Sequence, residues 1–322
     1  MRDHAFAVPD MSRRIPAFIG IDWGSTRLRA FQFDADGNVN QTRESDRGIA
    51  TVSDGNFDRI LTSMLQGWPS GLPMLMCGMV GSRHGWLEVP YHPCPMRLAE
   101  LSQSCGRVET AVGPAWIIGG LTTTSDSADR KAQHGGPWYD VMRGEETQIT
   151  GVAPPAGDLL TVTPGTHSKW TWVRDGIVQN FRTYMTGELY AVLRKHSILG
   201  SLMQEQESGC ADAAFMDGVH TAFEDQDLLH CIFNVRTQAL FNRKTPSTLS
   251  SYLSGILIGS EVAAGVRRYA TGATMIIASP ELSYRYNLAM KEAGMSHVAV
   301  MDGNEAVARG LWRLGQLRGL AG

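Results

Sequence analysis

Two short segments combine glycine, hydroxyl and charged side chains directly after an apolar run. The first is Asp22-Trp23-Gly24-Ser25-Thr26, and the second is Pro164-Gly165-Thr166-His167-Ser168-Lys169. Glycine lets the backbone bend sharply, and backbone N–H groups and hydroxyls can donate hydrogen bonds to phosphate oxygens. Asp22 could hold Mg²⁺ through water, because this ion takes oxygen ligands and keeps much of its hydration shell. Both segments are therefore candidate phosphate-binding turns.

Ordinary turn chemistry accounts for the same residues when each segment is taken alone. Asp is common in turns, and the hydroxyls of Ser25 and Thr26 could cap their own backbone. Lys169 could be a solvated lysine on a strand, since its charge alone does not indicate a phosphate. A functional site is favoured because the sequence contains two such segments.

The elements around the two segments follow the same order. Each segment joins an apolar strand to an alternating strand, which leads through an Asp-Gly turn into a third strand. The glycines of the two turns, Gly24 and Gly165, lie 141 positions apart. An internal repeat of this kind predicts two related domains that face each other across a cleft, each beginning with a meander of three antiparallel strands. Closure of the two domains on a nucleoside triphosphate would exclude water from the transferred phosphoryl group.

Hydrophobic periodicity predicts the remaining elements. Strands are expected where short apolar runs end at turn residues, and helices where apolar residues recur at intervals of three or four. We expect a polar surface loop over 122–136 and a helix that opens at Asp140. The other predicted strands are 74–77, 115–118, 275–278 and 298–301, and the other predicted helices are 57–65, 188–193, 248–266, 282–293 and 304–317.

The chain of 322 residues is long enough for two domains, and the segment Val152–Gly157, with two prolines and a glycine, is the predicted boundary. Residues 1–16 form a predicted disordered leader, 17–154 the first domain and 155–322 the second. The net charge of −3, without long runs of one sign, argues against nucleic-acid or membrane partners. The leader has no signal-peptide core, and the five cysteines form no C-x-x-C pair. We therefore expect a cytoplasmic protein with reduced thiols.

Over most of its length the sequence resembles the 2-dehydro-3-deoxygalactonokinases, a family within the actin-like ATPase superfamily. The two turn segments are similar to the first and second phosphate motifs of that superfamily. The resemblance implies an α/β fold with two ribonuclease H-like domains, each a mixed sheet with helices, that flank an interdomain cleft. It also implies Mg²⁺- and ATP-dependent phosphorylation of the terminal hydroxyl of 2-dehydro-3-deoxy-D-galactonate to the 6-phosphate in D-galactonate catabolism. The most specific similarities lie in Cys77–Trp86, Met142–Gln148, Pro164–Trp170 and Phe181–Leu189.

The resemblance also implies a general base. Related sugar kinases place a glycine and an acidic residue at the start of a helix before the second phosphate motif, and Gly144-Glu145 has that position. Such a carboxylate orients the primary hydroxyl and takes its proton as the new bond forms. In those related sugar kinases the acidic residue is Asp, whereas this chain has Glu145. Because Glu146 follows directly, either glutamate is a candidate. Both would also favour a helix N-terminus without any catalytic role.

Substrate and nucleotide contacts follow from the same resemblance. A 2-oxo acid presents a planar carboxylate that a guanidinium can bind with two hydrogen bonds, so Arg83 and Arg143 are candidates for it. Trp86, Tyr91 and Thr186 are expected in the same pocket, although a tryptophan in a loop more often packs against the protein. The residues expected at the phosphates are Gly24, Ser25, Thr26, Gly165, Thr166, His167, Ser168 and Lys169, with Asp22 at the metal and Ala278 and Ser279 at the adenosine.

Other functions are found on the same scaffold. An ATP or polyphosphate hydrolase would position water and need no carboxylate-binding pocket, and a non-catalytic actin-like module would bind ATP only for its conformation. Arg83, Arg143 and Glu145 favour the kinase. Its expected partners are the sugar acid and ATP, without nucleic acid or membrane, and a homodimer is left open.

Overall fold

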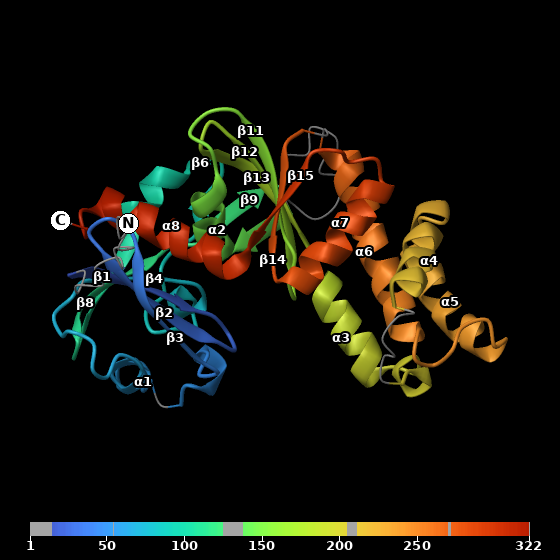
Figure 1. Cartoon of the computed structure of the whole chain (residues 1–322), viewed down its shortest axis with the longest axis horizontal. Helices are drawn as coiled ribbons and strands as arrows, with labels where there is room; N and C mark the ends of the chain where they lie inside the picture. The colour runs from blue at the N-terminus through green and yellow to red at the C-terminus, as the bar shows by residue number, and fades with distance from the viewer. Residues whose placement is uncertain (1–14, 54, 125–137, 205–210, 270–271, 322) are drawn as a thin grey trace, which may run out of the picture. The chain divides into compact units, whose positions relative to one another are not determined.

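The computed structural model describes residues 15–321, apart from 54, 125–137, 205–210 and 270–271. Packing divides the chain into two compact units, each with its own sheet and core (Figure 1). Unit 1 comprises Met1–Pro90, Ala99–Gly120 and Ala308–Gly322, and unit 2 comprises Tyr91–Leu98 and Leu121–Val307. All of the predicted leader except its last two residues lies outside the described residues.

Unit 1 is built on a mixed six-stranded sheet in the order β3-β2-β1-β4-β8-β7. Strands β1, β2 and β3 form the predicted antiparallel meander, β4 runs parallel to β1, and β8 runs parallel to β4. The carboxyl ends of β1 and β4 therefore lie side by side, which brings the first turn next to the loop after β4. The strands are β1 (Pro16–Trp23), β2 (Leu28–Asp34), β3 (Val39–Ser45), β4 (Met74–Cys77), β7 (Cys105–Thr110) and β8 (Gly113–Ile118).

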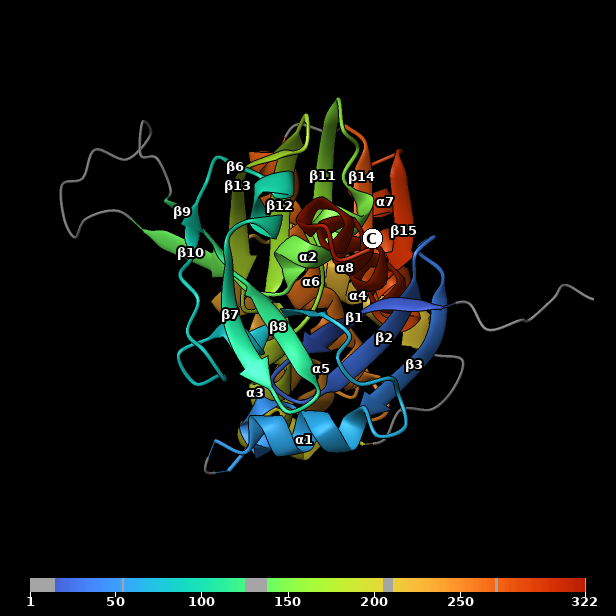
Figure 2. The same cartoon turned by 90° about the vertical axis from the view of Figure 1, so that its left-hand side faces the viewer.

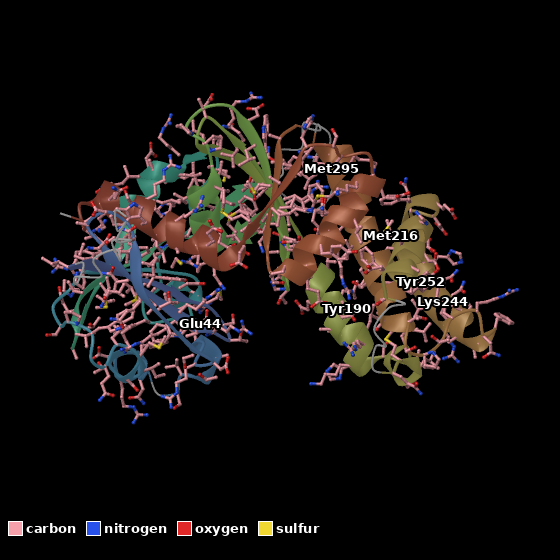
Figure 3. All side chains as sticks on the ribbon, viewed as in Figure 1. Glu44, Tyr190, Met216, Lys244, Tyr252 and Met295 are labelled. Carbon is pink, nitrogen blue, oxygen red and sulfur yellow. The ribbon has the colours of Figure 1, made fainter. Side chains whose placement is uncertain are left out.

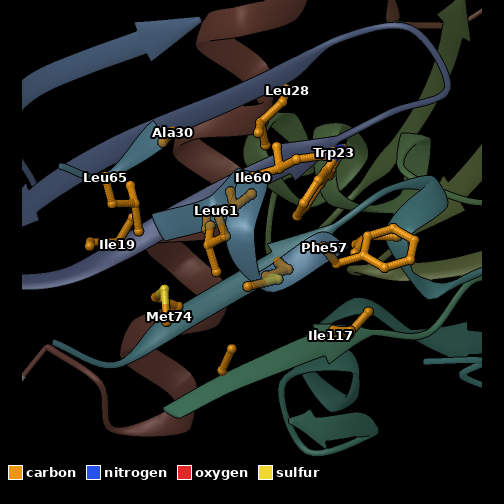
Figure 4. Packing of buried hydrophobic residues seen from close by; sticks show 14 of the residues in the cluster. Ile19, Trp23, Leu28, Ala30, Phe57, Ile60, Leu61, Leu65, Met74 and Ile117 are labelled. Atoms are coloured by element: carbon orange, nitrogen blue, oxygen red, sulfur yellow. The ribbon is translucent and has the colours of Figure 1, made fainter. Parts of the chain in front are cut away.

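One face of this sheet is covered by an aromatic and aliphatic core (Figure 4). Helix α1 (Phe57–Met64) directs Phe57, Ile60 and Leu61 into that core, because these positions recur at helical spacing. Trp23, at the end of β1, is fully buried there, and its ring meets the Phe57 ring edge-on with 5.5 Å between centroids. Core packing therefore fixes the end of β1, from which the first turn leaves.

The opposite face of the sheet packs against the last part of helix α8 (Gly303–Arg318), whose residues from Ala308 belong to unit 1. The Phe18 ring stacks on Trp312 with 5.7 Å between centroids. A Cβ on Gly20 would lie 3.1 Å from the Leu311 side chain, so helix and sheet approach closely at this glycine. Segments from both ends of the chain therefore build unit 1.

Unit 2 contains a second mixed six-stranded sheet in the order β15-β14-β11-β12-β13-β6 (Figure 2). Strands β11, β12 and β13 form an antiparallel meander, β14 runs parallel to β11, and β15 runs parallel to β14. Its strands are β6 (Met96–Arg97), β11 (Asp158–Thr163), β12 (Ser168–Arg174), β13 (Ile177–Tyr184), β14 (Thr274–Ala278) and β15 (Val298–Asp302). A smaller sheet joins β5 (His92–Pro93), β9 (Leu121–Thr124) and β10 (Tyr139–Met142).

The two large sheets share one plan. Strands β1, β2, β3, β4 and β8 of unit 1 correspond in order and direction to β11, β12, β13, β14 and β15 of unit 2. In each sheet an antiparallel meander continues into parallel strands. This agreement confirms the internal repeat and the prediction of two mixed α/β sheets of the actin-like kind.

Helices α6 and α7 lie beside the unit 2 sheet, and α4 and α5 lie on the far side of α6 (Figure 1). A Cβ on Gly255 would lie 2.0 Å from the Phe215 carbonyl oxygen, so α4 and α6 cross in direct backbone contact. α6 is the one described helix that is long and apolar enough to span a membrane, but 78% of its apolar window is buried inside the protein, as in a core helix. The helices are α2 (Glu145–Val152), α3 (Thr186–His196), α4 (Ala211–Glu224), α5 (Leu228–Leu240), α6 (Leu249–Arg268) and α7 (Pro280–Glu292).

Several sequence-based expectations differ from the structure. The stretch predicted as a loop over 122–136 begins within strand β9, and residues 125–137 lie outside the described residues. The helix expected to open at Asp140 begins at Glu145, because Tyr139–Met142 pairs with β9. The division between the packed units falls after Gly120, whereas the prolines at 154 and 155 connect α2 to β11 inside unit 2.

Candidate active site

The first turn is held in shape by a neighbouring segment of unit 1. The Ser25 carbonyl accepts a hydrogen bond from the Ala50 N–H at 3.0 Å. The Gly24 carbonyl accepts one from the Ile49 N–H, also at 3.0 Å. Gly48 is required here, since a Cβ would lie 2.3 Å from the Ser25 carbonyl carbon. The side chains of Ser25 and Thr26 are exposed at the tip. The turn is thus fixed by its backbone, which leaves both hydroxyls accessible.

The second turn is held in the same way within unit 2. A Cβ on Gly187 would lie 2.3 Å from the Gly165 carbonyl oxygen. The Thr166 carbonyl accepts from the Glu188 N–H at 2.9 Å, and His167 Nε2 lies 2.5 Å from the Glu188 carboxylate. The side chains of Thr166 and His167 are exposed. In both units, a glycine three residues after the third strand of the meander packs against the turn.

Asp22 is the last residue but one of β1, beside the first turn. Its register partner on β2 is Arg29, whose Nη2 lies 2.5 Å from Asp22 Oδ2, and only 12% of the Asp22 side chain is exposed. Gly78, after β4, has a φ of 91° and comes so close that a Cβ would lie 3.2 Å from Asp22 Oδ1. The carboxylate is therefore fixed at the carboxyl edge of the sheet.

This donor set fits Mg²⁺ better than a metal held entirely by protein. Within the described part of the chain, no group of three or more His, Cys, Asp and Glu side chains could hold a metal ion. Mg²⁺ usually binds through one or two carboxylates together with substrate phosphates and water. A single fixed carboxylate next to a phosphate-type turn meets that requirement.

In unit 2, the start of α2 brings Glu145 to the second turn. Glu145 Oε1 lies 3.1 Å from Lys169 Nζ, and Oε2 accepts from the Arg143 N–H at 3.1 Å. Lys169 Nζ also donates to the His167 carbonyl at 2.9 Å. Gly144 permits this approach with a φ of 111°. The Glu145 side chain is 23% exposed and that of Lys169 only 5%, so a buried lysine ties a solvent-facing carboxylate to the turn.

Glu146 has a different environment although it is the next residue. Its side chain is fully buried, and it accepts from the Gly144 N–H at 2.7 Å and from the Thr147 hydroxyl at 3.1 Å. Burial, and then the charge of Glu145, raises the pKa of Glu146 to about 7 against the opposing effect of these hydrogen bonds. Of the two candidate bases, only Glu145 therefore reaches solvent.

Arg143 and Tyr91, both predicted for the substrate pocket, lie together in unit 2. The Arg143 guanidinium sits over the Tyr91 ring at 4.3 Å from its centroid. Arg143 is buried, whereas 39% of Tyr91 is exposed. A cation–π contact orients a guanidinium without cancelling its charge. The backbone N–H of Arg143 donates to Glu145, so Arg143 is held next to the candidate base through its main chain.

Two more of the five predicted substrate residues, Arg83 and Trp86, lie in unit 1. Arg83 is exposed in the loop that follows the short 3₁₀ helix Met79–Gly81. Trp86 stacks on Phe57 with 5.8 Å between centroids and meets Trp23 edge-on at 6.3 Å. Most of the Trp86 ring therefore packs against the core of unit 1.

Ser168 and Thr186 donate hydrogen bonds to a buried acid, Glu261 on α6. The Ser168 hydroxyl donates to Oε1 at 2.6 Å, and the Thr186 hydroxyl donates to Oε2. Trp170 Nε1 and the Tyr286 hydroxyl also donate to this carboxylate, at 2.8 and 2.7 Å. Burial raises the pKa of Glu261, while the four donors oppose that rise. The hydroxyls of Ser168 and Thr186 are thus directed into the protein.

A pocket of about 230 Å³ opens beside the second turn, between α3, α6 and α7. Its walls include Gly165, Gly187, Tyr190, Leu257, Leu282 and Arg285, and Figure 3 marks Tyr190 on α3. Of the residues predicted at the adenosine, Ser279 is the N-cap of α7. Ala278 lines a separate pocket on the other side of α7, next to Val300 and Asp302 of β15.

Comparison with known proteins places the chain in a family. A family model described as 2-keto-3-deoxy-galactonokinase matches residues 22–314. The chain belongs to this family. A 2-dehydro-3-deoxygalactonokinase of Escherichia coli (strain K12) is 35% identical over 287 residues, which cover 88% of this chain and 92% of that protein.

Two further members of the 2-keto-3-deoxy-galactonokinase family agree with this. A probable 2-dehydro-3-deoxygalactonokinase, DgoK1, of Rhizobium meliloti (strain 1021) is 34% identical over 301 residues, or 91% of this chain and 95% of that protein. A crystal structure of a putative 2-dehydro-3-deoxygalactonokinase from Sinorhizobium meliloti has a TM-score of 0.83 at 33% identity, covering 93% of this chain and 98% of the other. These matches confirm the resemblance drawn from the sequence.

Sequence reasoning about this 2-keto-3-deoxy-galactonokinase missed two charged residues. Arg29 could have been found from the hairpin register, which places it opposite Asp22. Glu261 could have been found because it is the only charged residue in the otherwise apolar helical stretch 248–266. A lone acid on a buried helix requires hydrogen-bond donors around it, and this requirement is a usable signal.

Proposed function

We propose that the protein is an ATP-dependent kinase that phosphorylates the terminal hydroxyl of 2-dehydro-3-deoxy-D-galactonate to the 6-phosphate in D-galactonate catabolism. Membership of the 2-keto-3-deoxy-galactonokinase family supports this, as do the names of the curated relatives. In the structure, the observation that carries the proposal is the contact between Glu145 and Lys169. It places a solvent-facing carboxylate next to a phosphate-type turn, which is the arrangement needed to transfer a phosphoryl group to an alcohol.

Glu145 is the general base in this proposal. A primary hydroxyl is a poor nucleophile at neutral pH, and a carboxylate within hydrogen-bond reach can orient it and take its proton as the bond to phosphorus forms. The Lys169 ammonium lies 3.1 Å from this carboxylate and holds it beside the second turn. Glu146 is buried behind it and supports the position of Gly144 through the hydrogen bond from that residue's N–H.

The two turns bind the phosphates in this proposal. In the first turn, the exposed hydroxyls of Ser25 and Thr26 and the backbone around Gly24 are the donors. In the second turn, Gly165 and the exposed Thr166 and His167 contribute in the same way. Ser168 acts through its backbone, because its hydroxyl is directed to Glu261.

Asp22 would hold Mg²⁺ in this proposal. When bound, this ion neutralises charge on the phosphoryl oxygens. Arg29 keeps the Asp22 carboxylate in one orientation through their contact across the hairpin. Gly78 leaves room for that carboxylate, since a Cβ there would crowd Oδ1.

Arg143 is the residue proposed to bind the carboxylate of the sugar acid. Its guanidinium is oriented by Tyr91, and its backbone N–H donates to Glu145. A guanidinium pairs with a planar carboxylate through two parallel hydrogen bonds, which also fixes the direction of the carbon chain. Arg83, exposed in its loop, is proposed as a second contact, and Trp86 offers the part of its ring that the unit 1 core leaves accessible. Thr186 contributes by position rather than by its hydroxyl.

The nucleoside of ATP is proposed to occupy the pocket between α3, α6 and α7. That pocket includes Gly165 of the second turn, so a nucleotide with its phosphates on this turn would reach it directly. Tyr190 and Leu257 supply aromatic and aliphatic surface, and Arg285 supplies polar contacts. Ser279, which caps α7, is proposed to act next to this pocket, with Ala278 behind it.

A coupled assay of ADP release tests the proposal. ADP formation is measured with a panel of 2-oxo-3-deoxy sugar acids, with and without Mg²⁺, for the wild type and for Glu145→Gln. The wild type should release ADP only with Mg²⁺ and an acceptor, and Glu145→Gln should lower kcat by a factor on the order of 10² to 10⁴. Glu100→Gln, an exposed glutamate of unit 1, is the matched control and should behave as the wild type.

Two results would contradict the kinase. ATP hydrolysis at the same rate with and without any acceptor would indicate a hydrolase on the same scaffold. ATP binding without turnover under all these conditions would indicate a non-catalytic module. Equal loss of folding and activity in Glu145→Gln, seen by circular dichroism, would reduce the role of this glutamate to the start of α2.

We also infer that the protein works in the cytoplasm as a homodimer. In the described part of the chain no disulfide joins the cysteines, which suits a reducing compartment. Helix α5 exposes 82% of Leu229 and 57% each of Phe233 and Leu240, on the same stripe as Arg236. In an antiparallel pair of α5 helices, Leu229 would meet Leu240 of a second copy, and Phe233 would meet Arg236. Light scattering should give a dimer for the wild type and a monomer for Phe233→Glu.

A further inference from the structure

Glu261 gathers hydrogen bonds from three separate elements of unit 2. Ser168 and Trp170 on β12 donate to Oε1 at 2.6 and 2.8 Å. Thr186, at the start of α3, and Tyr286 on α7 donate to Oε2, the latter at 2.7 Å. Glu261 is only 3% exposed, so water cannot take the place of a lost donor and the loss would cost free energy.

Two of these elements, α3 and α7, line the pocket proposed for the nucleoside, and the third, β12, follows directly on the second turn. Gly165, three residues before Ser168, belongs to the second turn and lines that pocket. Thr186 and Tyr286 line it directly, and Gly187 rests against the Gly165 carbonyl. A shift of any one donor away from Glu261 would therefore move a wall of the pocket or the turn itself.

We propose that Glu261 is a positioning residue for the nucleotide. Its carboxylate holds the second turn, the start of α3 and helix α7 in the one arrangement that accepts a nucleotide, although it does not line the pocket itself. The inference rests on the proposed function, because it takes the pocket to be the nucleoside site. In this role, the buried Glu261 on α6 affects the affinity for the nucleotide rather than the rate of the chemical step.

The four donors require acceptors at both oxygens. Trp170 can only donate, whereas the hydroxyls of Ser168, Thr186 and Tyr286 can rotate and accept. A glutamine at 261 can keep its carbonyl oxygen opposite Trp170 and turn its amide towards the other pair, where Thr186 and Tyr286 would accept. A methionine has no comparable acceptor and would leave the Trp170 N–H without a partner. The two substitutions therefore separate loss of charge from loss of hydrogen bonding.

The test compares two buried tyrosines that each donate one hydrogen bond. Tyr286→Phe removes a donor to Glu261, and Tyr269→Phe removes the donor to the Trp170 carbonyl at 3.2 Å in the same core, away from the pocket. Binding of ADP with Mg²⁺ is measured by calorimetry, and KM is measured separately for ATP and for the sugar acid. Thermal unfolding reports the stability of each variant.

Tyr286→Phe should raise the Kd for ADP and the KM for ATP about tenfold and leave the KM for the sugar acid within about twofold. Tyr269→Phe should lower the unfolding temperature about as much as Tyr286→Phe does, but its Kd for ADP should stay within about twofold of the wild type. Glu261→Met should weaken ADP binding at least as much as Tyr286→Phe, and Glu261→Gln should recover most of the affinity.

The outcomes distinguish this inference from the proposed function. If the wild type does not bind ADP, both fall. If the wild type binds ADP and Tyr286→Phe binds it as tightly as Tyr269→Phe does, the kinase stands and the role of Glu261 falls. Equal loss of affinity in Glu261→Gln and Glu261→Met would also overturn it, because hydrogen-bond acceptance would then not be what positions the pocket.

Discussion

Glu146→Gln should remove a pH dependence of stability that comes from one buried acid. Burial and the adjacent charge of Glu145 raise the pKa of Glu146 from 4.5 to about 7. One pKa unit corresponds to about 1.4 kcal/mol of differential interaction. The shift therefore corresponds to about 3 kcal/mol between the protonated and ionised forms of the folded protein.

The sign follows from where the proton is held more tightly. Between pH 4.5 and about 7 the folded protein keeps the proton on Glu146 while the unfolded chain releases it. The free energy of unfolding therefore falls as pH rises through this range, and the stabilisation is complete below it and lost above it. Glutamine resembles the protonated acid, since its carbonyl can accept from the Gly144 N–H and its amide can donate to the Thr147 hydroxyl.

Urea unfolding from pH 5 to pH 8 measures this effect. The stability of Glu146→Gln relative to the wild type should rise by about 2 to 3 kcal/mol across that range, and the gain should level off above pH 7. A ¹³C carboxyl titration of Glu146 provides the pKa directly, and Glu145→Gln should lower it by removing the neighbouring charge. Parallel stability profiles for the two proteins, or a titration of Glu146 near 4.5, would refute the reasoning.

Three further predictions concern binding. Gly187→Ala should raise the KM for ATP at least about tenfold, because its Cβ would lie 2.3 Å from the Gly165 carbonyl oxygen, whereas Gly272→Ala, with no atom within 4 Å of its Cβ, should have little effect in the same assay. Arg143→Lys should raise the KM for the sugar acid about tenfold with the KM for ATP unchanged, since lysine cannot form the paired hydrogen bonds; equal changes in both constants would contradict this. Asp22→Asn should raise the Mg²⁺ concentration for half-maximal activity, and an unchanged metal titration would exclude Asp22 as the ligand.

Local patterns predicted the parts of the fold that repeat. The apolar run before Asp22 and the glycine turn after it define a hairpin from a few neighbouring residues, and the same holds around Gly165. The strand Met74–Cys77 was predicted with its observed bounds because it is short, apolar and flanked by turn residues. The repeat then predicted two related domains, each beginning with an antiparallel meander, which single segments could not do.

Other elements depend on partners that are distant in the sequence. Strand β7 has a polar alternating pattern and is a strand because it pairs with β8. Tyr139–Met142 reads as the approach to a helix, and it becomes a strand only because β9 offers a partner. Helices α4 and α5 were not predicted. Their apolar residues are divided between contacts with α6 and exposed positions, and they do not form one stripe that faces a single core.

Within the candidate site, residue types were easier to predict than their partners. Lys169 was expected as a phosphate ligand or a solvated side chain, and it is buried and paired with Glu145. Ser168 was expected to face a phosphate, and its hydroxyl faces Glu261 instead. Which way a strand residue points depends on register, and a shift of one residue reverses it.

The two hairpins pair their charged residues in different ways. Asp22 and Arg29 face each other in the first copy, and Thr163 and Lys169 occupy the corresponding paired positions in the second. The second copy has a threonine where the first has its acid, so Lys169 pairs with Glu145 on a neighbouring helix. The ion pair therefore stays within the hairpin in the first copy, whereas in the second it joins the hairpin to the start of α2.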